Sequence, residues 1–186
     1  MVIAITIVSY SDAQTSKADF RDFSWGSSLA EVQSKEKTEF SFKDKDDLLE
    51  YKDVVGGYDC KVLYGFNEND KLINGNYLFL KKYSNPQLYI QDYTIFKNLL
   101  IQKYAKPTLE LENWNKNTPT GDKTNYGQAI ADGNLTLSSY WETDRSYVKI
   151  ILTAIDNHPS LQIHYTTKTL DELENKEQIK KALFKL

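Results

Sequence analysis

Residues 86–104 carry the strongest local pattern of the sequence, an apolar stripe with the period of an α-helix. Its aromatic and leucine side chains recur every three or four positions and share one helix face over about four turns. Pro86 opens the segment, and Lys106 and Pro107 end it. Segments with the two-residue period of β-strands lie on both sides, which predicts an α+β fold. The stripe consists of Tyr89, Tyr93, Phe96, Leu100 and Tyr104.

A meander of antiparallel strands is predicted before this helix. Ser28, followed three residues later by Glu31, forms a capping box that predicts a short helix near the start of the domain. The next segments alternate or are rich in aromatic and β-branched residues, and charged, polar or glycine turns separate them. The predicted strands are 39–42, 48–51, 58–64 and 71–82, with turns at 43–47, 56–57 and 67–70.

A second meander is predicted after the long helix. Segment 109–114 alternates as a strand, and the polar stretch 115–125 predicts a mobile loop. Three more alternating segments follow, and a second capping box, from Thr169 to Glu172, introduces a C-terminal helix. The three strands are 135–141, 148–152 and 161–165, and the turns between them are 144–146 and 157–160.

The predicted order along the chain is helix, strands, helix, strands, helix. We therefore expect one α+β domain over residues 19–186, built from two units that each contain a helix and an antiparallel meander. The pseudo-repeat halves are about 20–84 and 85–168, and the C-terminal helix spans 169–186. A helix over one face of each sheet leaves the other face and the loops free for a partner.

Residues 1–18 are similar to a short or weak signal peptide. An apolar run at 2–8 precedes Ser11 and Ala13, which have the spacing of a signal-peptidase site. No basic residue precedes Lys17, so the positively charged start of such a signal is missing. The β-branched run also fits a strand of the folded domain. This run of seven residues is far shorter than the roughly 18 that a membrane helix needs, so no transmembrane segment is predicted.

The composition argues against several functions. The chain has 23 Lys and Arg against 26 Asp and Glu, a net charge of −3, which gives no general attraction for nucleic acid. One cysteine and two histidines cannot build a disulfide or a Cys/His metal cluster. Gly56 and Gly57 precede a strand, which does not suit a phosphate-binding loop. We expect no cofactor and no metal, with Cys60 buried and inert and with His158 and His164 at the surface.

The sharpest candidate for catalysis is the pair Glu142 and Asp144, next to Trp141. Two carboxylates beside an aromatic side chain would suit a hydrolase of envelope carbohydrate. Arg145 would keep both carboxylates ionised, although such an enzyme needs their pKa values to differ. The sequence therefore favours a protein without catalytic activity.

Tyrosine is the unusual feature of the composition. The 13 Tyr, 8 Phe and 3 Trp favour a binding surface, because tyrosine supplies amphipathic contact area at low entropic cost. Most of the tyrosines fit the periodicity of the core. The predicted binding surface comprises Tyr126, Tyr140, Tyr147 and Trp141.

Residues 20–32 carry the phrase F-x4-W-G-x-S-x2-E-V, and later motifs follow it in order. The series resembles a set of secreted or periplasmic bacterial proteins, most of them uncharacterised, over most of residues 20–165. Ala105 stands where their pattern usually has Gly. At the level of fold the set is similar to the beta-lactamase-inhibitor-protein and SmpA/OmlA-like architecture, which implies a concave sheet presented to another protein and no shared catalytic residues. The later motifs are V-x-Y-x-F-N-x-N-D-K-L at 62–72, L-x2-K-Y-x-K-P at 100–107, Trp114, and S-x-W-x-T at 139–143.

The sequence thus predicts a non-enzymatic bacterial protein that acts outside the cytoplasm. We expect it to bind another envelope or secreted protein, or an envelope component, through a sheet face and the loop at 115–125. Two alternatives stay open. One is a hydrolase of envelope carbohydrate that uses Glu142 and Asp144, and the other is a cytoplasmic structural protein in which residues 2–8 form a strand.

Overall fold

A computed structural model of the chain describes residues 18–43, 48–115 and 123–168. The predicted signal peptide up to residue 17, the turn at 44–47, most of the loop at 115–125 and the predicted helix 169–186 lie outside these residues. The described elements are α1 (Leu29–Lys35), β1 (Glu39–Lys43), β2 (Leu48–Val55), β3 (Tyr58–Phe66), β4 (Leu72–Phe79), α2 (Gln87–Tyr104), β5 (Leu109–Trp114), the 3-10 turn η1 (Lys123–Asn125), α3 (Tyr126–Ala131), β6 (Leu135–Glu142), β7 (Ser146–Ile155) and β8 (His158–Thr167).

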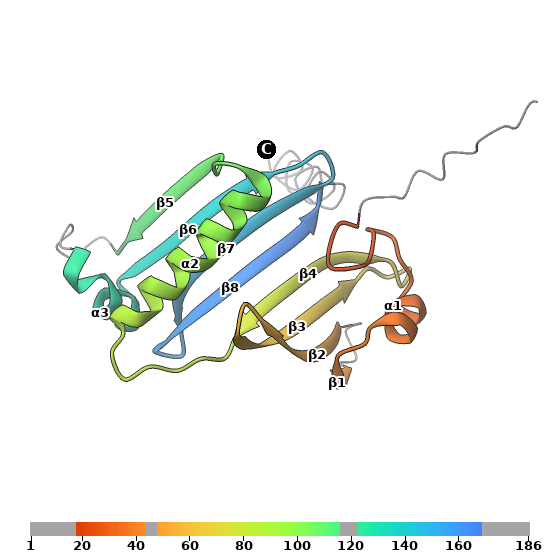
Figure 1. The fold of residues 1–186 in the computed structure, drawn as a ribbon, viewed down its shortest axis with the longest axis horizontal. Coiled ribbons are helices and arrows are strands. Elements are labelled where there is room, and N and C mark those ends of the chain that lie inside the picture. Colours follow the sequence, from red (N-terminus) through yellow and green to blue (C-terminus); the bar gives the residue numbers. More distant parts are fainter. Residues whose placement is uncertain (1–17, 44–47, 116–122, 169–186) are drawn as a thin grey trace, which may run out of the picture.

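The strands form a single antiparallel sheet in the order β1-β2-β3-β4-β8-β7-β6-β5 (Figure 1). Each half of the chain supplies a four-stranded meander. The last strands of the two meanders, β4 and β8, pair with each other from Asn74 opposite Thr166 to Leu78 opposite Gln162. The α+β class is confirmed. The expected division into two helix-plus-meander units is corrected, because strands dominate the fold and both meanders belong to one continuous sheet.

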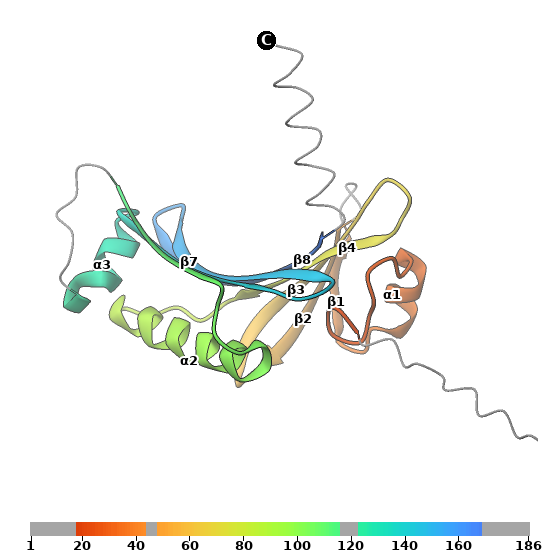
Figure 2. The same cartoon turned by 90° about the horizontal axis from the view of Figure 1, so that it is seen from above.

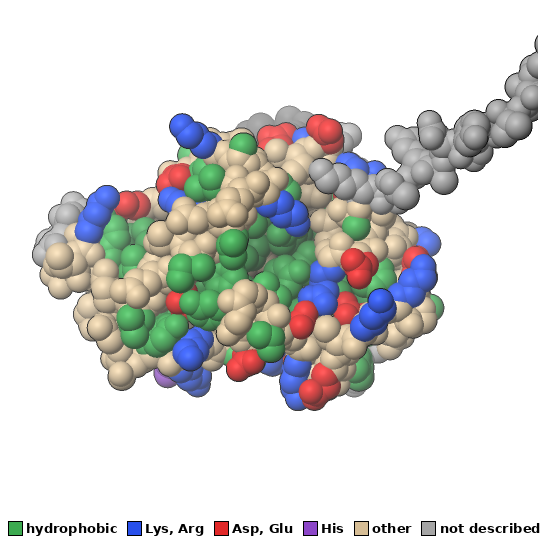
Figure 3. Space-filling model, in the orientation of Figure 1, with side chains coloured by type: hydrophobic (Ala, Val, Ile, Leu, Met, Phe, Trp, Pro, Cys, Tyr) green, Lys and Arg blue, Asp and Glu red, His purple; other side chains and the backbone are tan. Residues whose placement is uncertain are grey.

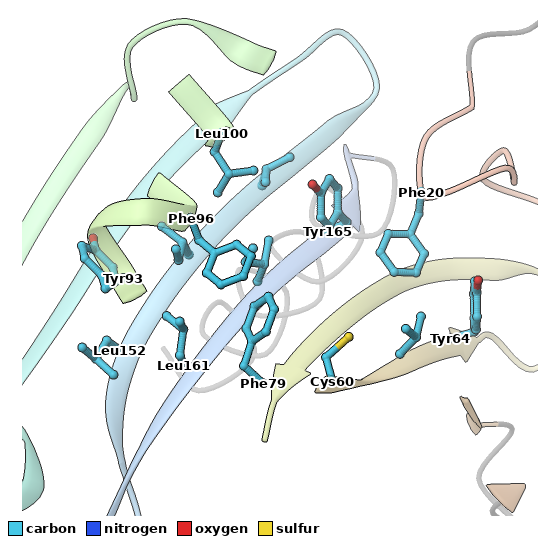
Figure 4. Packing of buried hydrophobic residues seen from close by; sticks show 14 of the residues in the cluster. Phe20, Cys60, Tyr64, Phe79, Tyr93, Phe96, Leu100, Leu152, Leu161 and Tyr165 are labelled. Atoms are coloured by element: carbon cyan, nitrogen blue, oxygen red, sulfur yellow. The ribbon is translucent and has the colours of Figure 1, made fainter. Parts of the chain in front are cut away.

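Helix α2 covers one face of the sheet over the second half of the chain. It packs on β7 and β8, and Figure 2 shows α2 and α3 on the same side of the sheet. Four of the five residues of the stripe that predicted this helix, Tyr89, Tyr93, Phe96 and Leu100, are buried, and the fifth, Tyr104, is half-buried. The side chains of Tyr93, Phe96 and Leu100 point toward the sheet, where Leu152, Leu161 and Phe79 lie (Figure 4). No described helix or strand covers the opposite face.

The first half of the sheet is covered differently. Helix α1 has only seven residues and begins where Ser28 Oγ accepts a hydrogen bond from the Glu31 N–H, as the capping box predicted. The core face of this half is covered mainly by the loop at 18–27, whose Phe20 is 1% exposed and lies at the seam between the two meanders. The Phe20 ring centroid is 5.2–5.3 Å from those of Tyr64, Tyr77 and Tyr165 (Figure 4).

Two local predictions need correction. Helix α3 was not predicted, because it has only six residues and no side-chain hydrogen bond at its N-cap. The last hairpin turns at Asp156 and Asn157, both with positive φ, which suits a tight two-residue turn. His158 and Pro159, predicted within that turn, are the first residues of β8.

The helix side of the molecule has a mixed surface. Figure 3 shows hydrophobic side chains over its middle, with basic and acidic side chains scattered toward the edges. Ile95 and Leu99 of α2 are nearly half exposed there.

Candidate functional site on the open face of the sheet

The face of the sheet opposite α2, called here the open face, carries a row of polar and aromatic side chains across four strands. Alternation places Leu135, Leu137, Ser139 and Trp141 of β6 in the core, as predicted, and turns Tyr140 to the open face. Strand register then puts Tyr140 opposite Lys149 of β7, Lys149 opposite His164 of β8, and His164 opposite Asn76 of β4.

A shallow groove of about 400 Å³ runs along this row. Tyr147 of β7 lies opposite Glu142, two residues along each strand from the Tyr140–Lys149 pair, so the two tyrosines are diagonal neighbours. Both are half-buried, with part of each ring open to solvent. The groove extends to Leu109, which lies opposite Tyr140 and is 49% exposed. The side chains that define it are Leu109, Tyr140, Glu142, Tyr147, Lys149 and His164.

The charges in this groove leave a small positive excess at neutral pH. Burial, together with the nearby charge of Lys149, lowers the pKa of His164 to about 4, so this imidazole is neutral at pH 7. Glu142 is neutralised by Lys168, whose Nζ lies 2.7 Å from Oε1 and 5.7 Å from the ring centroid of Tyr147. Within the described residues, Lys149 has no carboxylate at ion-pair distance. It can therefore pair with a carboxylate supplied by a partner.

Of the four residues predicted to form a binding surface, the structure brings Tyr140 and Tyr147 together on the open face and places the other two in the core. Trp141 is 2% exposed, and its Nε1 donates to the Ala105 carbonyl at 2.9 Å. Tyr126 is 6% exposed, and its hydroxyl donates to Glu112 at 2.7 Å. Their place in the expected surface is therefore corrected: both rings fix elements to the sheet.

The other candidates for chemistry have structural surroundings. Trp141 points into the core and Glu142 to the open face, so the predicted placement of this carboxylate beside Trp141 is wrong. Cys60 is buried, as expected, and burial raises the pKa of its thiol to about 11. His158 is exposed, whereas His164 is half-buried in the groove rather than at the surface.

A buried charge cluster was not found from the sequence. Arg21 Nη1 lies 2.6 Å from Asp53 Oδ2, and Arg21 Nε lies 3.2 Å from Glu36 Oε2, with the Glu36 side chain only 4% exposed. Glu36 also accepts hydrogen bonds from the Tyr64 hydroxyl and from Thr38. All its charged groups have internal partners, so the cluster attaches the loop at 18–27 to the sheet. Its members are separated along the chain and follow no period, which left no signal in the sequence.

No three His, Cys, Asp or Glu side chains in ranges 18–43, 48–115 and 123–168 come together as metal ligands. None of the described helices has the length and apolar character needed to cross a membrane. Comparisons with protein-family models, curated proteins and solved structures found no match.

Proposed function

We propose that this chain is a non-enzymatic binding module that receives another protein on the open face of its sheet. The observation that carries the proposal is the pair of half-exposed tyrosines, Tyr140 and Tyr147. They border a groove containing Lys149, which has no carboxylate at ion-pair distance in the part of the chain that the structure describes. Tyrosine-lined surfaces with one well-placed charge suit recognition of a protein loop. The partner is expected to place an acidic side chain between the tyrosines.

We further propose that the protein acts outside the bacterial cytoplasm, on an envelope or secreted partner. The support is the sequence alone: the export-like residues 1–18 and the resemblance of residues 20–165 to secreted and periplasmic proteins. Mass spectrometry of the N-terminus of the native protein, after cell fractionation, tests export: a chain that begins near Gln14 supports it, and an intact Met1 in the cytoplasm opposes it.

We also propose that halves 20–84 and 85–168 are a diverged repeat. The symmetrical strand order, with β4 and β8 at its centre, supports this idea.

Site-specific photo-cross-linking in the source cells tests the binding face. A photoreactive phenylalanine analogue replaces Tyr140 or Tyr147, and the matched control carries it at Asn98, an exposed position on the α2 side. The proposal predicts a discrete cross-linked protein from the two open-face positions and none from position 98. Lys149→Glu is expected to abolish that product by repelling the acidic partner. Equal products from all three positions, or products without a second protein, would contradict the proposal.

A further inference from the structure

Strand β5 has a free edge that borders the open-face groove at Leu109. Figure 1 shows β5 as the outermost strand of the second half, with α2 running alongside it. Strand β5 pairs with β6 on one side, and within the described residues no strand pairs with its other side. An edge strand offers a row of unpaired backbone groups to which an extended segment can add.

The side chains of β5 divide cleanly between the two faces of this edge. Leu109 and Leu111 point to the open face, because they lie opposite Tyr140 and Ser138. Glu110 and Glu112 point to the α2 side, and both carboxylates are exposed. The edge therefore offers apolar side chains on one face and carboxylates on the other.

Grooves flank the edge on both faces. The groove of the open face reaches Leu109, and a second groove, of about 560 Å³, separates α2 from β5. This second groove contains both carboxylates, each already held in place. Glu110 Oε2 lies 2.8 Å from Lys97 Nζ, and Glu112 accepts the Tyr126 hydroxyl at 2.7 Å. Side chains of an added strand, which alternate between faces, would enter the two grooves in turn.

The backbone geometry shows which groups an added strand would use. The Asn115 N–H donates to the Asn134 carbonyl, which continues the register of β5 with β6. Donors alternate in direction along an antiparallel ladder, so the N–H groups of Glu110 and Glu112 turn outward to the free edge.

We propose that the β5 edge binds an extended protein segment in which basic and apolar residues alternate. Basic side chains would lie opposite Glu110 and Glu112, and apolar ones opposite Leu109 and Leu111, which are favourable cross-strand pairs. A second copy of β5 is a poor occupant. Antiparallel pairing centred on Leu111 would set Glu110 opposite Glu112 of the other copy, and like charges there repel.

Titration of the full chain with a synthetic peptide, acetyl-Lys-Val-Lys-Val-Lys-Val-amide, tests the proposal. Amide hydrogen exchange at Glu110 and Glu112 should slow on binding, because their N–H groups become hydrogen-bonded. The same residues in blocks, three Lys and then three Val, should bind at least about tenfold more weakly, since they cannot match both faces. A peptide with Glu in place of Lys should show no binding.

Matched variants locate the site. Glu110→Gln with Glu112→Gln should weaken peptide binding about fivefold. The charge pair of the peptide with Glu112 is lost, together with a weaker one to Glu110, which Lys97 already pairs, while glutamine keeps an acceptor for Lys97 and Tyr126. The control, Glu39→Gln, makes the same change on the opposite edge strand, β1, and should have no effect. Equal binding of the block peptide, unchanged exchange at Glu110 and Glu112, or a loss caused by Glu39→Gln would each overturn the proposal. The result is separate from the cross-linking test, because it depends on the backbone and carboxylates of β5, whereas cross-linking probes Tyr140 and Tyr147.

Discussion

Replacement of Ala105 by glycine should stabilise the protein, because this residue has a backbone conformation that suits glycine. Ala105 ends α2 with φ at 65° and ψ at −159°, a region that residues with a Cβ rarely occupy. The Trp141 indole N–H, which donates to the Ala105 carbonyl, helps to hold the chain in this conformation. The strain is relieved when the Cβ is removed.

The expected gain follows from two opposing terms. Relief of the strained conformation is worth about 1–3 kcal/mol, and the greater freedom of glycine in the unfolded chain costs about 0.4–1 kcal/mol. Ala105→Gly should therefore raise the free energy of unfolding by about 1 kcal/mol, which corresponds to about 3 °C in Tm for a domain of this size.

Urea denaturation measures this change, with an unchanged slope showing that the same surface is exposed on unfolding. The matched control is Ala129→Gly in α3, where the same chemical change in a helix should lower stability by about 1 kcal/mol. Loss of stability in both variants would refute the assignment of strain to Ala105.

Three further predictions concern the core and the groove. The free energy of unfolding should fall by roughly 2 kcal/mol from pH 6.5 to about 4, because over this range His164 is protonated in the unfolded chain but stays neutral in the folded protein, where its pKa is about 4. Urea denaturation at each pH measures this loss, and His164→Gln should remove it. Gly127→Ala should cost about 3 kcal/mol or more, since its Cβ would lie 2.4 Å from the Gln87 backbone nitrogen; thermal unfolding that matched the parent would contradict the close approach of α2 and α3. Arg21→Met should cost about 3 kcal/mol by leaving Glu36 buried without its cation, and a double-mutant cycle with Glu36→Gln should recover part of that loss.

Periodicity predicted the elements that are long or regular. The stripe from Tyr89 to Leu100 predicted α2, and alternation in β6 and β7 correctly assigned the core face, because burial on one side repeats at a fixed interval. Helix α3 was not predicted, because its second residue, Gly127, is a poor helix former. Glycine is required at this position by the close approach to Gln87. The need for glycine at this position comes from packing between α2 and α3, and the local sequence pattern does not reveal such packing.

The candidate site was predictable only in part. Tyr140 and Tyr147 lie on the polar phase of their strands, and alternation alone turns them away from the core. Trp141 shares the phase of Leu135 and Leu137, so its burial follows from the same rule that predicted the strand. The placement of Tyr126 depends on α3. The row through Lys149 and His164 requires the β7–β8 register, which is a property of the assembled sheet.

The seam between β4 and β8 has a consequence for how chains associate during folding. The two meanders meet along this single ladder, and the linker 80–86 that joins them crosses from one to the other. A chain whose linker was too short to return would still carry both halves of the seam, and would complete its sheet with the complementary half of another chain. We therefore expect a shortened linker to shift the balance from a closed monomer toward a domain-swapped pair.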